Sequence, residues 1–356
     1  DFLMVPAFQF GGMEHAGAIF YNAPSMLLEE SATQNQMLGR ASTISHEVAH
    51  MWFGDLVTMR WFNDVWTKEV FANFMAAKIV NPSFPEVNHE LRFLLDHYPS
   101  AYEIDRTQGA NPIRQPLENL DDAGTLYGNI IYDKAPIVMR QLETITGEVP
   151  FRDGIREYLK RFSYANATWP ELIEILDKRT PEDLKSWSKT WVEERGRPEI
   201  RIVRHDQSIS IAQRDPMNRG RVWPQQIGLL AGASAKSTFL RGRAEEIKLA
   251  DNPGYVLPSG YGLFRLDDLT KSYLLAKIET ISDPKVHGAA WLDLWENFLD
   301  GQVQRPDLLR AVLRALPVER DQQIASLLLG YMDRLYWYYS TVAERSALTS
   351  TLETLT

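Results

Sequence analysis

One short segment, residues 42–54, limits what this chain can fold into more than any other. It reads STISHEVAHMWFG and places His46 and His50 four positions apart, with Glu47 directly after the first histidine. Residues four apart on an α-helix share one face, so both imidazole rings can face the same point. A helical pattern over 34–53 agrees with this arrangement, in which Glu47 could reach a water on a metal ion bound by the histidines.

A second predicted helix carries the candidate for a third ligand. Apolar residues recur at spacings of three and four over 64–80, which indicates an amphipathic helix. Glu69 lies in this helix, and eighteen residues separate it from His50. Catalytic zinc usually takes three protein ligands and leaves its fourth position to water. If the two helices pack together, His46, His50 and Glu69 can bind one zinc ion per chain.

The alternative is that two ordinary helical histidines match the pattern by chance. In a chain of this length, His-Glu-x-x-His arises by chance with odds of about one in a hundred, and a glutamate at the right offset lowers the odds further. The pattern therefore favours a metal site. The later histidines are expected to have structural roles: His89, His97, His205 and His287.

Length and composition exclude several classes of protein. The chain has 356 residues, which suits two or three domains, and its net charge of −9 argues against a nucleic-acid partner. It has no cysteine, which excludes disulfides, thiolate zinc sites and cysteine nucleophiles. No run of about 18 apolar residues occurs, so no membrane span is expected. The sequence indicates no compartment, because cytoplasmic and exported locations both agree with it.

The pattern along the chain changes twice. Residues 1–22 contain short apolar runs around Gly11 and Gly12, which indicate a hairpin or edge strand, and 125–195 are mostly helical, with breaks expected at Gly147, Pro150 and Trp169-Pro170. Residues 197–268 alternate as short strands, and the helical pattern returns from 269. The chain begins within a strand pattern and stops within a helical one, so it is expected to be a fragment of a larger protein.

Three motifs together resemble one known family. They are GGMEH at 11–15, HEVAHMWFGDLVTMRWFNDVWTKEVFANF at 46–74 and YDKA at 132–135. Their order and spacing are similar to those of the aminopeptidase N family of zinc metallopeptidases, a gluzincin family that includes the leukotriene-hydrolase branch. The resemblance extends to about residue 196.

The resemblance implies a multidomain α+β fold. It implies a thermolysin-like, mostly helical catalytic domain over 1–196, a small β-sandwich over 197–268 and the start of an α-helical domain over 269–356. The N-terminal β-domain of the family is not in this sequence. In the family, that domain closes over the substrate.

The resemblance also implies a zinc-dependent aminopeptidase that acts on peptides with a free N-terminus through a zinc-activated water. His46, His50 and Glu69 would bind zinc, and Glu47 would be the general base. Tyr132 would donate its hydroxyl to the oxyanion, and Glu14 would bind the α-ammonium of the substrate. The remaining contacts with the substrate would come from Gly11, Gly12 and Met13, which would lie along it as an added strand, and from Gln9, which would flank its first side chain.

Several alternatives stay open. An endopeptidase of the thermolysin type, an epoxide hydrolase and a non-catalytic zinc-binding scaffold would share much of this pattern, and Tyr127 competes with Tyr132 for the catalytic role. Asn73 is a candidate partner for a ligand histidine. The family pattern is broken at the following positions: His15, Lys68, Val70 and Ala135-Pro136. Five aromatic residues near the motif are expected to be core: Trp52, Phe53, Trp61, Phe62 and Trp66.

Overall fold

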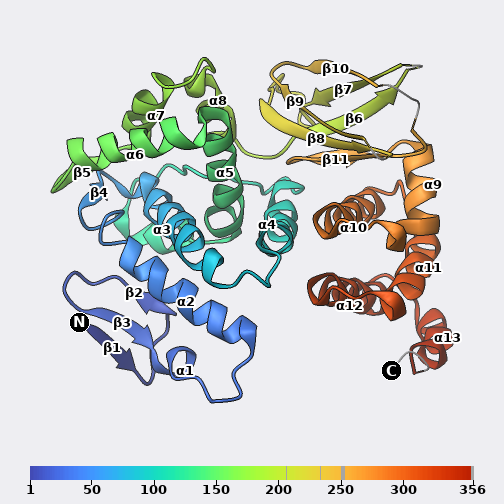
Figure 1. The fold of residues 1–356 in the computed structure, drawn as a ribbon, viewed down its shortest axis with the longest axis horizontal. Helices are drawn as coiled ribbons and strands as arrows, with labels where there is room; N and C mark the ends of the chain where they lie inside the picture. The colour runs from blue at the N-terminus through green and yellow to red at the C-terminus, as the bar shows by residue number, and fades with distance from the viewer. Residues whose placement is uncertain (206, 233, 250–252, 354–356) are drawn as a thin grey trace. The chain divides into compact units, whose positions relative to one another are not determined.

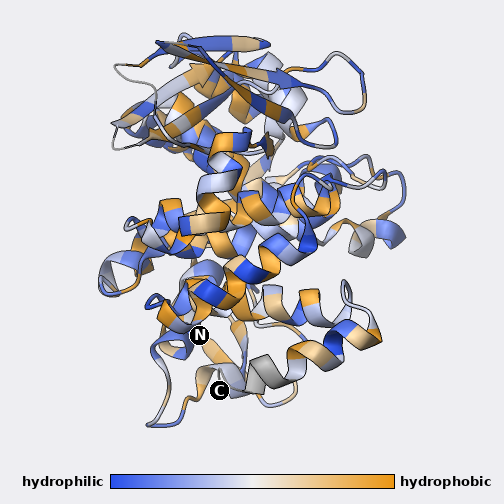
Figure 2. Cartoon of the chain, turned by 90° about the vertical axis from the view of Figure 1, so that its right-hand side faces the viewer, coloured by the Kyte–Doolittle hydropathy of each residue, from blue (hydrophilic) through white to orange (hydrophobic). Residues whose placement is uncertain are grey.

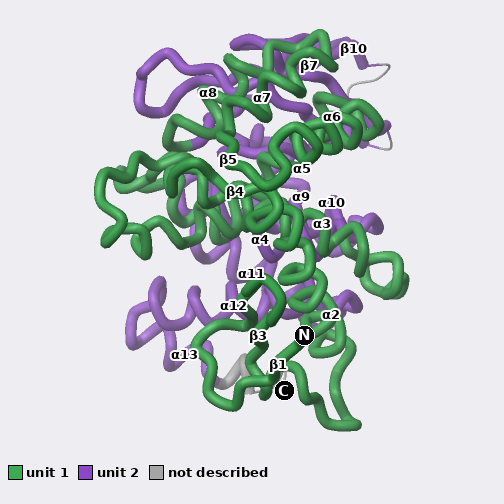
Figure 3. Tube along the Cα trace, turned by 90° about the vertical axis from the view of Figure 1, so that its left-hand side faces the viewer, with its two compact units in different colours: residues 1–89, 100–196 green, residues 90–99, 197–356 purple. Residues whose placement is uncertain are grey.

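The computed structural model describes residues 1–205, 207–232, 234–249 and 253–353, which form both helices and strands (Figure 1). The chain divides into two compact units (Figure 3). Unit 1 contains residues 1–89 and 100–196, and unit 2 contains residues 90–99 and 197–356. Because residues 90–99 belong to unit 2, unit 1 does not contain the whole of the catalytic domain that the sequence predicts over 1–196. The three-domain division of the chain stays a prediction.

Unit 1 begins with a three-stranded sheet in the order β1-β3-β2. Strand β1 (Phe2–Val5) runs parallel to β3 (Ile19–Asn22), and β2 (Gly12–Met13) is antiparallel to β3. The short strand β2 is therefore an edge strand, as the pattern around Gly11 and Gly12 predicts. The following helix is α1 (Ala23–Met26), and buried residues of β3 and α1 form a cluster with Ile44 and Val48 of the next helix and with Met51 just beyond it.

Helices α2 (Gln34–Ala49) and α3 (Trp66–Val80) pack against each other. A capping box of Thr33 and Gln36 begins α2. The helix ends earlier than the sequence pattern predicts, since His50 is its C-cap. Beyond it, the amides of residues 55, 56 and 57 bond to the carbonyls of residues 50, 51 and 52, and Gly54 has a φ of +135°. This turn directs the chain into β4 (Val57–Met59), which pairs in parallel with β5 (Ala165–Ala167).

Among the remaining helices of unit 1, α5 and η4 pack against α3, α6 and α8 pack on α5, and α7 packs on α6 and α8. Gly147, with a φ of +89°, separates α5 from α6 as predicted, but Pro150 does not break a helix. The helical run is interrupted before Trp169-Pro170, which begins α7. These prolines lie in the first turns of α6 and α7, where the missing amide has no intrahelical acceptor. The elements are η1 (Phe62–Asp64), η2 (Asn81–Ser83), η3 (Leu120–Leu126), η4 (Ile130–Lys134), α5 (Ala135–Thr146), α6 (Glu148–Arg161), α7 (Trp169–Asp177) and α8 (Leu184–Val192). Helix α4 (His89–Asp105) is divided between the two units, since residues 90–99 belong to unit 2.

Unit 2 contains two sheets, in the orders β10-β7-β6-β12 and β11-β8-β9. Their strands are β6 (Glu199–Arg204), β7 (Ser208–Arg214), β8 (Gln225–Ala231), β9 (Ser234–Leu240), β10 (Ala244–Lys248), β11 (Val256–Ser259) and β12 (Leu263–Arg265). Buried residues alternate along β6, β7 and β8, which is the period of a strand with one covered face. One hydrophobic cluster includes residues of both sheets, such as Ile211 and Ile227.

The rest of unit 2 is helical, as predicted from 269 onward. Its elements are α9 (Asp268–Lys277), η5 (Ile278–Thr280), α10 (Pro284–Leu299), α11 (Arg305–Ala315), η6 (Leu316–Val318), α12 (Gln322–Trp337) and α13 (Val342–Glu353). Trp291 and Trp295 of α10 lie in the core that these helices share. Hydrophobic and hydrophilic residues mix along the helices (Figure 2). Among the described residues, none of the helices combines the length and the hydropathy that a membrane span requires.

Candidate active site

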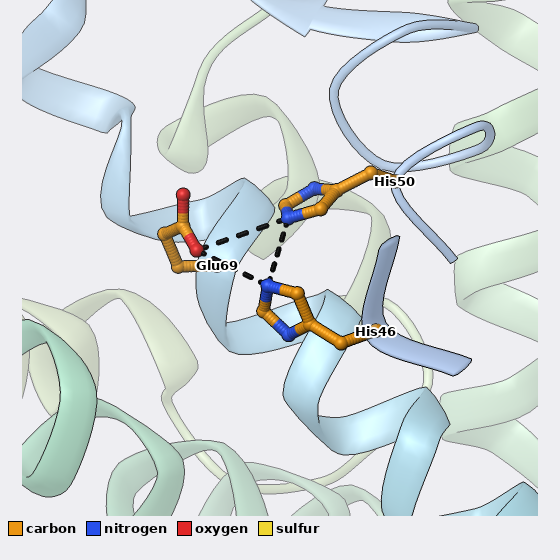
Figure 4. Close-up of side chains that lie close together, drawn as sticks. All are labelled: His46, His50 and Glu69. Carbon is orange, nitrogen blue, oxygen red and sulfur yellow. Dashed lines mark hydrogen bonds and ion pairs between the residues drawn. The ribbon is translucent and has the colours of Figure 1, made fainter. Parts of the chain in front are cut away.

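His46 of α2, His50 at the C-cap of α2 and Glu69 of α3 converge on one point in unit 1 (Figure 4). The Nε2 atoms of His46 and His50 lie 3.0 Å apart, and Glu69 Oε2 lies 3.4 Å and 3.8 Å from them. Ligand atoms about 2.0–2.1 Å from a tetrahedral zinc ion are separated by roughly 3.3 Å. The spacing of the three atoms therefore fits one zinc ion.

The hydrogen bonds of the two imidazoles leave the converging nitrogens free of protons in the neutral rings. Nδ1 of His46 lies 2.9 Å from Asn73 Oδ1, and Nδ1 of His50 lies 3.0 Å from the Phe53 carbonyl oxygen. Both partners accept hydrogen bonds, so each Nδ1 carries the proton and each Nε2 presents a lone pair. Two lone pairs that face each other favour a cation between them. Asn73, named from the sequence as a candidate partner, makes this contact.

The site histidines differ in their electrostatics. Burial lowers the pKa of His50, and the neighbouring His46 lowers it further, which favours a neutral ring. Burial also opposes a charge on His46, but hydrogen bonding and attraction to Glu69 raise the pKa of His46. Of the two rings, His46 is thus the one whose positive charge Glu69 stabilises more strongly.

Glu69 is a buried carboxylate whose two oxygens have separate partners. Oε2 faces the histidines, while Oε1 lies 2.8 Å from Lys68 Nζ. Burial alone would raise the pKa of Glu69, but the hydrogen bond with His46 and the charge of Lys68 outweigh it and lower the pKa to about 2. Glu69 is therefore ionised across the ordinary pH range, as a ligand of a divalent cation must be.

Glu47 is also buried and lies against the edge strand β2. A Cβ on Gly12 would lie only 2.5 Å from Glu47 Cγ, so the absence of a side chain at Gly12 makes room for the carboxylate. Burial raises the pKa of Glu47 to about 7; Glu14 and Glu69 add to this increase, and His46 opposes it. A carboxyl group with a pKa near neutrality is suited to accept and return a proton.

Glu14 follows β2 and lies close to Glu47 and His50. Its Oε1 is 2.5 Å from Lys68 Nζ, and it forms with Glu47 and His50 a group whose potential ligand atoms all lie within 4.8 Å of one another. Burial alone would raise the pKa of Glu14, but Lys68 and His50 lower it. Gly11 and Met13 flank Gly12 in the same segment, whereas Gln9 is exposed ahead of β2.

The two candidate tyrosines lie side by side. Tyr132 belongs to the π-helix η4, and its ring stacks on that of Tyr127, with centroids 6.3 Å apart. Burial raises the pKa of both hydroxyls, and Glu69 adds to the increase in each, so both are proton donors at neutral pH. The arrangement brings both residues to the site, and the choice between them stays a prediction.

Comparison with known proteins agrees with this geometry. The peptidase family M1 domain matches residues 1–191. The chain belongs to peptidase family M1. The resemblance to the aminopeptidase N family that the three motifs indicate is thereby confirmed, and family M1 is zinc-dependent in general.

Three relatives illustrate the similarity. The chain is 28% identical to aminopeptidase N of Streptomyces lividans over 379 residues, which cover 98% of this chain and 44% of that protein. It is 32% identical to leucyl aminopeptidase of Saccharolobus solfataricus over 211 residues, or 59% of this chain and 27% of the relative. It is 31% identical to the puromycin-sensitive aminopeptidase of Caenorhabditis elegans over 256 residues, or 67% of this chain and 27% of the relative. The chain spans less than half the length of each.

Some expectations about this M1 chain were wrong or incomplete. Phe53 and Trp66 are core residues as expected, but Trp52 and Trp61 are 48% and 42% exposed. Trp52 follows the end of α2, where the chain leaves the packed helix. Sequence reasoning also missed Tyr21, whose buried hydroxyl has a pKa raised to about 12 by burial and by Glu47. The sequence marked Lys68 as a departure from the family pattern, but it did not predict the ion pairs that Lys68 makes with Glu14 and Glu69.

Proposed function

We propose that this protein is a zinc-dependent aminopeptidase and that His46, His50 and Glu69 bind one zinc ion per chain. The observation that carries the proposal is the convergence of His46 Nε2, His50 Nε2 and Glu69 Oε2, which lie 3.0, 3.4 and 3.8 Å from one another. Membership of family M1 and the names of its relatives support the same activity.

When bound, zinc would supply Lewis acidity that polarises the substrate carbonyl and lowers the pKa of water. Glu47 accepts a proton from the attacking water and returns it to the leaving amine. Its buried carboxyl group, with a pKa raised to about 7, supports this role. Tyr132 donates its hydroxyl to the carbonyl oxygen as negative charge develops there. The adjacent Tyr127 is the alternative donor, because its ring stacks on that of Tyr132.

The substrate class in this proposal is a peptide with a free N-terminus. Glu14 binds the α-ammonium, and Gly11, Gly12 and Met13 line the substrate as an added strand, for which the edge position of β2 leaves one side open. Gln9 would flank the first side chain. A carboxylate close to the metal ligands favours cleavage of the first peptide bond over an internal one, since an internal bond offers no ammonium.

The proposed domain arrangement is that of the family. A thermolysin-like catalytic domain spans 1–196, a small β-sandwich spans 197–268 and a helical domain spans 269–356, with an N-terminal domain of the same protein as a further partner. The hydrophobic cluster shared by two sheets supports the sandwich. Buried Glu47 argues against a purely structural zinc scaffold, which needs no general base. The aminopeptidase names of the relatives favour peptides over epoxides as substrates.

Mass spectrometry of cleavage products tests this function. Two peptides of identical sequence, one with a free amine and one N-acetylated, are incubated with the zinc-loaded protein. Stepwise removal of N-terminal residues from the free peptide, with the acetylated peptide nearly unchanged, is expected. Internal cleavage of the acetylated peptide at a comparable rate would indicate an endopeptidase, and no cleavage of either peptide would contradict the proposal.

A further inference from the structure

Lys68 is an ammonium group held between two functional carboxylates. Its Nζ lies 2.5 Å from Glu14 Oε1 and 2.8 Å from Glu69 Oε1. The side chains of Lys68 and Glu14 are only 15% and 16% exposed, and that of Glu69 is 8% exposed. Lys68 thus connects the candidate substrate-binding carboxylate with the candidate metal ligand.

The position of Lys68 is not explained by the stability of α3. It is the third residue of the helix, where the positive end of the helix dipole disfavours a cation. Its stem passes Gly54, where a Cβ would lie 3.5 Å from both Lys68 Cδ and His50 Nδ1. The side chain is therefore directed along the site by its packing, toward the two glutamates that attract it.

We propose that Lys68 occupies the place of the substrate ammonium at Glu14 and thereby sets how strongly this enzyme prefers a free N-terminus. The inference rests on the proposed function of Glu14. Hereafter the position beside Glu14 Oε1 is called the ammonium site. An incoming peptide must displace Lys68 from this site or share the carboxylate with it.

The chemistry of the two cations makes them competitors. A lysine side chain and a peptide N-terminus both present a primary ammonium with three donors, and both favour a charge-assisted bond to the same carboxylate. Lys68 is tethered to the site, so it competes without the loss of freedom that a separate ligand undergoes. When it leaves Glu14 it keeps its contact with Glu69, which makes the displacement possible.

The expected consequence is a weakened preference that removal of Lys68 restores. With Asn or Met at position 68, Glu14 is open to the substrate amine alone, and the repulsion between two ammonium groups is gone. The affinity for a free amine should rise, while that for an acetylated analogue should not. A purely structural role of Lys68 would change both affinities together.

Calorimetric titration measures the ratio of the two affinities, for a free amine and for its acetylated analogue. The zinc-loaded Glu47→Gln protein, which is expected not to turn over its ligands, is titrated with L-leucinamide and with N-acetyl-L-leucinamide. The same titrations are made with two double variants, in which the Glu47→Gln protein also carries either Lys68→Asn or Lys68→Met. We expect the affinity ratio of free to acetylated amide to rise about 10-fold or more in both variants. An equal or lower ratio, including a ratio of one throughout, overturns the proposal.

Matched variants identify the cause of the change. Lys78→Met removes another lysine of α3, whose Nζ lies 2.7 Å from Glu143 Oε1, and should leave the ratio unchanged. Glu14→Gln combined with Lys68→Asn should cancel the gain, and a gain that persists overturns the proposal. The zinc content and peptide cleavage of the unmodified protein are measured separately. Their failure would refute the proposed function, whereas the role of Lys68 is judged from the affinity ratio alone.

Discussion

Glu69 in unit 1 and Glu199 in unit 2 are two buried carboxylates with the same low pKa and different surroundings. Burial opposes the ionisation of each, and hydrogen bonds lower the pKa of each to about 2. Glu69 faces two imidazoles and one ammonium. Glu199 instead lies 2.9, 2.5 and 3.1 Å from the guanidinium groups of Arg201, Arg214 and Arg265.

The difference separates a binding site from a structural ion network. Arginine is a permanent cation that only donates, so the three guanidinium groups satisfy Glu199 and leave no acceptor for a metal ion. The imidazoles beside Glu69 are acceptors at Nε2, and their lone pairs converge with the carboxylate oxygen. A low pKa alone therefore does not identify a functional carboxylate, whereas the chemistry of its partners does.

The largest expected effect comes from Glu47→Gln, which keeps the shape of the buried side chain but removes the proton acceptor. Activity should fall by several orders of magnitude, more than the ~10²–10⁴ of a typical general base, because Glu47 also orients the attacking water. Zinc content should stay unchanged. Steady-state kinetics and elemental analysis check this, and a variant that keeps a tenth of the activity would refute the role of Glu47.

Tyr132→Phe should have the next largest effect, since it removes one oxyanion donor. A loss in kcat of about 10²–10³ with full zinc content is expected. Tyr127→Phe is the matched control, because the two rings stack on each other. If Tyr127→Phe is inactive and Tyr132→Phe turns over at the full rate, the catalytic role belongs to Tyr127.

Gly12→Ala should disturb Glu47 without a change to any reacting group. The added methyl group would meet the buried Glu47 side chain and displace its carboxylate, and a misplacement of about 1 Å can cost on the order of 10²-fold in rate. Gly39→Ala is the control, because Gly39 lies in α2 outside the proposed site and a Cβ there would meet no atom within 4 Å. Equal kcat values for the two variants would show that Gly12 makes no room for the base.

Glu199→Gln should have the smallest effect on function and a measurable effect on stability. The loss of hydrogen bonds to charged partners should lower the free energy of unfolding by about 2 kcal/mol at pH 7. Because folding lowers the pKa of Glu199 from 4.5 to about 2, its stabilisation is present above pH 4.5 and lost as the pH falls toward 2. Unfolding curves at several pH values should thus converge in acid, and a constant difference down to pH 2 would contradict this.

Much of the site could be predicted from local patterns. The spacing of His46 and His50 fixes their common helix face, and the apolar period over 64–80 predicts the helix that carries Glu69. The pattern did not predict that α2 ends before His50, because the turn depends on bonds across five residues around Gly54. Trp52 and Trp61 lie outside α2 and α3, where helical periodicity does not show which side chains are covered, so the sequence did not predict their exposure.

The contacts of Lys68 lay beyond sequence reasoning for a similar reason. Lys68 and Glu14 are 54 positions apart, and their ion pair depends on how β2 and the two helices pack. Composition and periodicity carry no information on such a pair. The division of α4 between the two units also depends on packing, since this one helix carries residues of both units and has Pro99 at the boundary between them.

Zinc content is the most direct test of the account. Protein purified without added metal is examined by elemental analysis in three forms: unmodified, Glu69→Ala and Glu199→Gln. Both variants lose a buried carboxylate with a pKa of about 2, but only Glu69 lies with the imidazoles. We expect one zinc ion per chain in the unmodified protein and in Glu199→Gln, and loss of most of it in Glu69→Ala, because two histidines alone lack the third protein ligand. Retention of one zinc ion per chain by Glu69→Ala would contradict the assigned site.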